Sequence, residues 1–183
     1  MLNYPEQKDL LKKFSKHSKI AGVIFILLGL AGIIFPGLMS LATAIFFAWL
    51  LIFSAFVTGY HTYNINPKDW LGWLKAFIFL ITGILIAINP LPGVAALGII
   101  FAIYFLFDSF AGFALAFQIK PQKGWWLPLI NGILSLIIAV IFIIGWPFSS
   151  LILVGLLVGI SLFFDGIVLL SMGSFVDKLN KEK

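Results

Sequence analysis

The sequence predicts an all-α fold: an integral membrane bundle of six transmembrane helices built as three repeated helical hairpins. Of its 183 residues, 62% are hydrophobic and only 10% are charged, and the mean hydropathy is +1.13. An ordinary soluble domain carries about 25% charged residues. Too few polar residues are present to cover a water-facing surface. The composition therefore excludes a soluble globular domain, a disordered chain and a nucleic-acid-binding domain.

The order of the helices follows from three long apolar runs, residues 20–67, 76–119 and 124–176, which contain only two charged residues. A helix crosses the bilayer core in about 20 residues, so each run can hold two spans. Pro and Gly near the middle of each run mark a turn between the two helices. Strands are not expected, because the runs are apolar on both faces and lipid requires hydrogen bonds to close within each segment. The expected spans are residues 18–35, 38–60, 71–88, 94–117, 126–144 and 149–173.

The lysines predict the orientation of these spans. All twelve basic residues are lysines, and none lies at the Pro-bearing tips of the hairpins. They flank the opposite ends of the spans, so the positive-inside rule places both termini in the cytoplasm and the tips outside. The expected organisation is a basic cytoplasmic N-terminal segment (1–17), a transmembrane domain (18–173) and a cytoplasmic tail (174–183). The repeats within the domain cover about 18–63, 71–119 and 125–173.

The N-terminal basic segment has two interpretations. Residues 9–19 place Leu10, Leu11 and Phe14 on one side of a helix and most lysines on another. Such a segment can lie on anionic headgroups as a surface helix. Alternatively, it is a solvated basic tail that only sets the orientation of the chain.

An internal threefold repeat appears when the tip prolines Pro36, Pro90 and Pro147 are aligned. Small residues then coincide twelve positions later, at Ala48, Ala102 and Gly159, and polar residues coincide eighteen positions later, at Ser54, Asp108 and Asp165. Because all three copies enter the membrane from the same side, the repeat is parallel rather than inverted. Small residues allow helices to pack closely in lipid, and the spacing of Gly155 and Gly159 is one such motif.

The candidate functional residues are Asp108, Asp165 and Ser54. Both acids lie in the inner half of the membrane, about 21 and 24 Å below the outer ends of their helices. A carboxylate at such a depth is costly and should face the bundle, water or a partner. No cation lies at matching depth, so the expected partners are polar neutral side chains: Ser54, Ser109, Thr58, Ser161 and Thr82.

Three interpretations of these residues stay open. They form a proton-responsive site or polar pathway, because an apolar environment favours the neutral carboxyl. Alternatively, they are protonated hydrogen-bond links that hold equivalent helices together. The third interpretation is a water-filled depression reached from the cytoplasm.

Residues for enzymatic or metal chemistry are missing from the sequence. It has no cysteine, no phosphate-binding glycine loop, and no set of nucleophile, base and metal ligands. We therefore expect no enzyme activity, no cofactor and no metal site. The expected partner is the lipid bilayer and not nucleic acid, and the sequence leaves open a homo-oligomer or another membrane-protein partner.

Several segments resemble the HdeD-like acid-resistance membrane proteins. They are the Gly-x6-Pro tips at 29–36 and 83–90, Ile-Asn-Pro-Leu-Pro-Gly at 88–93, Asn-Gly-Ile-Leu-Ser-Leu at 131–136 and Phe-Phe-Asp-Gly-Ile at 163–167. The resemblance covers about residues 20–173. It implies a non-enzymatic bacterial inner-membrane protein with six spans that contributes to survival of acid stress. The alternative is a small proton-coupled transporter or channel. Two departures are Val140 in place of the expected Gly and Ser54 in place of Asp.

Topology reporters test the predicted orientation. Reporters fused to either terminus, or inserted between residues 66 and 69, should report the cytoplasm, because lysines flank these sites. Reporters inserted beside Pro36, Pro90 or Pro147 should report the periplasm. A terminus in the periplasm or a Pro-bearing tip in the cytoplasm would contradict the prediction.

Overall fold

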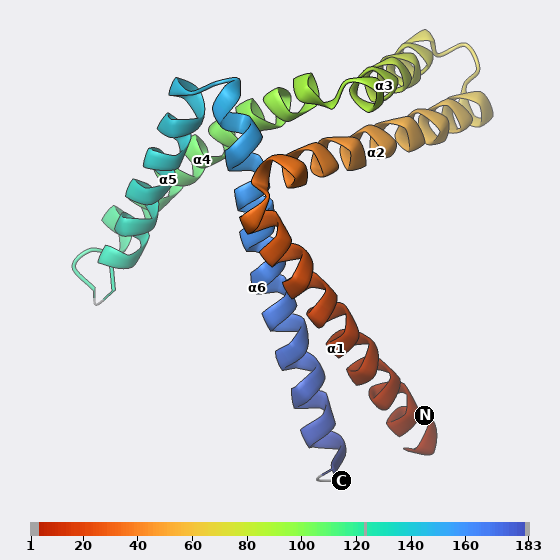
Figure 1. Cartoon of the computed structure of the whole chain (residues 1–183). Helices are drawn as coiled ribbons and strands as arrows, with labels where there is room; N and C mark the ends of the chain where they lie inside the picture. Colours follow the sequence, from red (N-terminus) through yellow and green to blue (C-terminus); the bar gives the residue numbers. More distant parts are fainter. Residues whose placement is uncertain (1–3, 123, 182–183) are drawn as a thin grey trace. The chain divides into compact units, whose positions relative to one another are not determined.

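The computed structural model describes residues 4–122 and 124–181, and in these residues the chain forms six helices (Figure 1). All six are long and apolar enough to cross a membrane. They confirm the predicted all-α class. Their bounds are α1 (Tyr4–Ile34), α2 (Pro36–Ile65), α3 (Trp70–Ile88), α4 (Pro90–Ile119), α5 (Trp126–Ile144) and α6 (Phe148–Lys181).

The helix boundaries differ from the predicted ones by up to four residues at the Pro-bearing tips, and by more at the start of α1 and at the ends of α2 and α6. The predicted ends of α3 and α5 agree with the structure to within one residue, whereas α1, α2, α4 and α6 are longer than predicted. Pro36 and Pro90 are the first residues of their helices rather than parts of a loop. Proline suits this position because the first turn of a helix needs no backbone N–H donor and the ring fixes a helical φ. Only Phe35 and Asn89 are left between the helices at these tips.

The chain forms two compact units, described here separately. Unit 1 contains the chain up to Met39 and from Gly155 onward, and unit 2 runs from Ser40 to Val154. Unit 1 is therefore made chiefly of α1 and most of α6. Unit 2 contains most of α2, all of α3, α4 and α5, and the first residues of α6.

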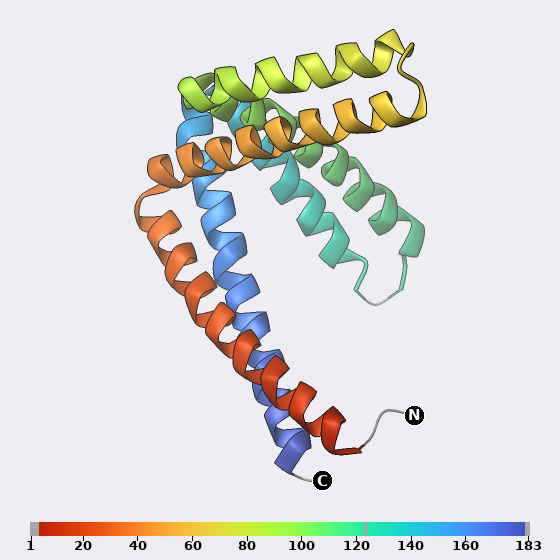
Figure 2. The same cartoon turned by 90° about the vertical axis from the view of Figure 1, so that its right-hand side faces the viewer.

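In unit 1, α1 and α6 lie side by side and antiparallel, so the first and last helices meet at the end that carries both termini (Figures 1 and 2). The contact consists largely of glycine backbone. A methyl group added to Gly29 would lie 2.5 Å from the Phe163 nitrogen, and one added to Gly22 would lie 2.8 Å from the Gly166 oxygen. Any larger residue at these positions would force the two helices apart.

The basic segment before the first span continues α1 without a break. At about 1.5 Å per residue, the 31 residues of α1 extend about 46 Å, well beyond a bilayer core of about 30 Å. Ser15 and Ser18 are buried, and the Ser15 hydroxyl donates a hydrogen bond to the Gly173 carbonyl oxygen at 2.8 Å. Residues 12–19 are therefore packed within unit 1, an arrangement that neither a separate surface helix nor a solvated tail describes.

The core of unit 2 lies where α2, α4 and the first turns of α6 meet. The Ser40 hydroxyl donates to the Leu151 carbonyl oxygen at 2.7 Å, which joins α2 to α6. Gly98 of α4 lies directly against the Ser150 side chain, so only glycine fits there. Val94 and Val154 fill the remaining space and are almost completely buried.

Each long helix carries a row of buried small residues at seven-residue spacing, which we call its seam. The three residues of each seam lie 12, 19 and 26 positions after the tip prolines Pro36, Pro90 and Pro147. A seven-residue period keeps one face of a helix against its neighbour in a left-handed crossing. The seams are Ala48, Ala55 and Thr62 in α2; Ala102, Ser109 and Ala116 in α4; and Gly159, Gly166 and Gly173 in α6.

The seams of unit 2 pair each long helix with the helix that follows it across the lysine-bearing connection. A methyl group added to Gly83 of α3 would lie 2.9 Å from the Ala48 oxygen of α2. One added to Gly112 of α4 would lie 2.9 Å from the Gly132 Cα of α5. By contrast, α3 and α4 touch little, although a Pro-bearing tip joins them. The repeated hairpin of the sequence therefore does not coincide with the closely packed pair of helices.

In the third repeat, the buried small residue that precedes the tip proline lies one position earlier than in the other two repeats. Val140, which aligns with Gly29 and Gly83, is exposed, whereas the neighbouring Ala139 is fully buried. The connection between α5 and α6 contains residues 145–147, which is longer than the single residue at each of the other two tips. The longer connection accommodates the shift, and Ala139 takes the buried place that Gly29 and Gly83 occupy in the other repeats.

Substitution of Gly29, a glycine of α1 that contacts α6, tests the packing of unit 1. Gly29→Leu should lower the free energy of unfolding by about 1–3 kcal/mol, because the side chain would overlap the α6 backbone. Ala31→Leu, at an exposed position two residues later, is the matched control and should change it by less than about 0.5 kcal/mol. Unfolding in detergent measures both variants. Equal effects would contradict the close contact of α1 and α6.

Candidate intramembrane carboxyl site

The best-defined polar site within the spans is centred on Asp108. This residue lies in α4 immediately before the seam residue Ser109, so it is at the edge of the face that α4 turns toward α5. Its side chain is half-buried. The seam brings the two helices close enough for short side chains on α5 to reach it.

Two donors from α5 bind the same oxygen of Asp108. Ser135 Oγ donates to Asp108 Oδ2 at 2.5 Å, and Asn131 Nδ2 donates to the same atom at 3.1 Å. Asn131 and Ser135 are four residues apart and therefore lie on one face of α5. Ser135 is only 4% exposed. The three side chains link α4 to α5 inside the span.

Both partners of Asp108 are neutral, which determines what the site can do. In the described part of the chain the ion pair found is Lys19 with Asp177, outside this site. Asp108 Oδ1 has no hydrogen bond to a described residue. The link between α4 and α5 is therefore made by one carboxyl oxygen, Oδ2, and by two neutral donors.

The predicted partners of Asp108 were wrong. None of the serines and threonines expected to bond to it does so, and the buried Ser109 hydroxyl has no partner. The expectation assumed links between equivalent helices of the repeat, whereas α4 packs against α5. Asp108 lies twelve residues before Lys120 and Ser135 lies ten after Trp125, so the two residues are at similar distances from the connection between these helices.

The other two candidate residues are not part of this site. Ser54 in α2 is half-buried and forms no side-chain hydrogen bond with a described residue. Asp165, in unit 1, is exposed and forms neither a hydrogen bond nor an ion pair with a described residue. The next residue, Gly166, lies against Gly22 and Ile26 of α1, and neither of these residues has a side chain that can donate a hydrogen bond. The three aligned positions therefore have three different environments.

The grooves of unit 2 are lined mostly by apolar side chains. Its grooves include one of about 260 Å³ between α4 and α5, lined by Ile99, Ala102, Ile103, Leu106, Phe142, Ile143 and Trp146. Among the residues described, His, Asp and Glu side chains form no group of three that could hold a metal ion.

Removal of one donor tests the link between α4 and α5. Ser135→Ala should lower the free energy of unfolding by about 0.6–1.7 kcal/mol, because it removes a buried hydrogen bond within the membrane. Ser161→Ala, at an exposed serine in α6, should have little effect. Asp108→Asn should be tolerated better than Asp108→Leu, since the amide oxygen still accepts both bonds. A lower free energy of unfolding for Asp108→Asn than for Asp108→Leu would contradict this geometry.

Comparison with known proteins identifies the family. A family model described as "Short repeat of unknown function (DUF308)" matches residues 20–87 and 74–144. Protein HdeD from Escherichia coli K12 is 30% identical over 175 residues, which cover 93% of this chain and 92% of HdeD, and Protein HdeD from Shigella flexneri matches equally well. No solved structure matches the chain significantly. The chain is thus a multi-pass membrane protein that belongs to the DUF308 family of HdeD-like proteins.

Proposed function

We propose that this protein is a non-enzymatic protein of the bacterial inner membrane that contributes to survival of acid stress. Its termini lie in the cytoplasm, as the distribution of lysines predicts. Membership of the HdeD-like family supports the location and the stress-related role. The site at Asp108 supports a role that depends on protons.

The observation that carries this proposal is a carboxyl held by two neutral donors within a span. A carboxylate paired with Lys or Arg would be held in its charged form. Asn131 and Ser135 provide hydrogen bonds to Asp108 without a compensating positive charge. The protein would limit proton entry or sense acidification through this residue.

The experiment compares carboxyl variants in an acid challenge. Asp108→Asn combined with Asp165→Asn should leave insertion and protein level unchanged but reduce survival to that of a deletion strain. Asp69→Asn is the matched control, because this carboxyl lies in the connection before α3. Cytoplasmic pH, followed in the same cells, distinguishes a loss of protection from slower growth.

Two results would contradict the proposal. Wild-type survival of the double variant would eliminate the role of the two carboxyls. Proton-coupled solute uptake by the purified protein in liposomes would instead support the alternative of a small transporter or channel.

A further inference from the structure

Three pairs of helices pack along seams: α2–α3, α4–α5 and α6–α1. The pairs are equivalent in the repeat, but the ends of their helices are joined in different ways. In the pairs α2–α3 and α4–α5, residues 66–69 and 120–125 connect the ends of the two helices. The pair α6–α1 follows the same cyclic order, since the end of α6 meets the start of α1. Its helices are the last and first of the chain, so no connection joins them.

Two side-chain contacts occupy the position of the missing connection. Gly173 is the last seam residue of α6 and corresponds to Thr62 of α2 and Ala116 of α4. Asn66 lies four residues after Thr62, and Lys120 lies four residues after Ala116. The two connections begin at Asn66 and Lys120. Four residues beyond Gly173 lies Asp177.

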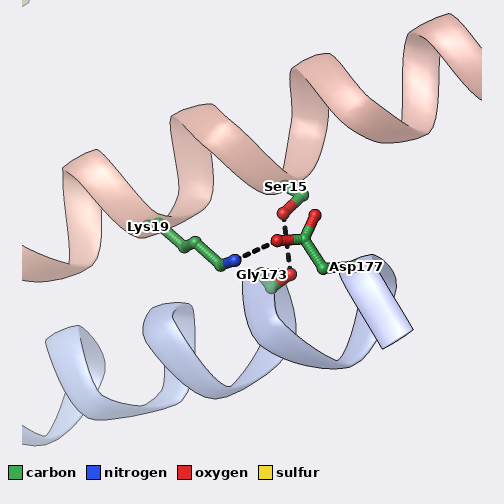
Figure 3. Close-up of polar contacts among 4 residues, drawn as sticks. All are labelled: Ser15, Lys19, Gly173 and Asp177. Carbon is green, nitrogen blue, oxygen red and sulfur yellow. Dashed lines mark hydrogen bonds and ion pairs between the residues drawn. The ribbon is translucent and has the colours of Figure 1, made fainter. Parts of the chain in front are cut away.

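Asp177 forms an ion pair with Lys19 of α1, and one turn away the buried Ser15 hydroxyl donates to the Gly173 carbonyl oxygen at 2.8 Å (Figure 3). The Lys19 and Asp177 side chains are 36% and 40% exposed, so ions in the surrounding water can reach them. Exposed ion pairs contribute little and are weakened by salt. A covalent connection, in contrast, cannot open.

We propose that Lys19–Asp177 and Ser15–Gly173 form a latch that takes the place of a connection and makes α1–α6 the pair that can separate at its end. Toward the other end, the helices are held by the glycine contacts at Gly22 and Gly29. At these contacts, side chains such as Leu170 and Ile26 pack directly against glycine of the opposite helix, and no hydrogen bond or ion pair joins described residues of the two helices there. The pair therefore opens from the end that carries the termini, and ionic strength controls this opening.

Distances between spin labels test the latch in the full chain in lipid nanodiscs. The protein has no cysteine, so His17→Cys with Ser174→Cys labels the end of α1–α6 at two exposed positions. Gln118→Cys with Leu127→Cys labels the corresponding end of α4–α5 as a control. At low salt both pairs of labels should give a single short distance.

Asp177→Asn should increase the separated population of the α1–α6 end about five-fold, the factor that corresponds to loss of about 1 kcal/mol. The exchange Lys19→Asp with Asp177→Lys should restore the short distance. Raising the salt concentration should separate the labels in the wild-type chain but add little in Asp177→Asn. The control pair should not change under any of these conditions.

The salt titration needs no latch variant, so it tests the proposal even if Asp177→Asn does not fold. An unchanged distance in the wild-type chain at high salt would overturn the latch. Equal separation of the control pair would also overturn it, because the loosening would then not be specific to α1 and α6.

Discussion

Two helices in lipid gain little from burying apolar side chains against each other, because the surrounding acyl chains are as apolar as leucine. Close approach of the backbones is what holds them, and small residues permit it. The seams of α2, α4 and α6 meet this requirement with alanine, serine, threonine or glycine at the same three positions after each tip proline. The pairing of helices and the placement of Asp108 both depend on this constraint.

The seam also explains how a carboxyl can be accommodated inside a span. Asp108 lies beside Ser109, where α4 and α5 approach most closely, and this proximity allows Ser135 and Asn131 to reach one oxygen. Both hydrogen bonds offset part of the cost of placing the carboxyl in lipid. Asp108 therefore links the two helices through one of its oxygens, Oδ2.

The repeats share a scaffold but not a chemistry. Ser54, Asp108 and Asp165 occupy the same position after the tip proline, yet donors from the paired helix bind only Asp108 among the three in the described structure. Asp165 is exposed and forms no hydrogen bond with a described residue. The small residues of the seam are thus the feature common to all three repeats, while the polar group beside them has diverged.

The sequence by itself determined the number of spans, the three tips and the repeat. These properties follow from hydropathy and from counting residues along a helix, which need no knowledge of neighbours. Only the tertiary structure decided which helices pair, that residues 12–19 continue α1 against α6, and that Asn131 and Ser135 are the partners of Asp108. The physical reason is that spans are apolar on every side, so their hydropathy marks no contact face. Small residues are frequent in all six helices. Only the close contact of a seam with small residues of another helix, seen in the structure, shows which helix is its partner.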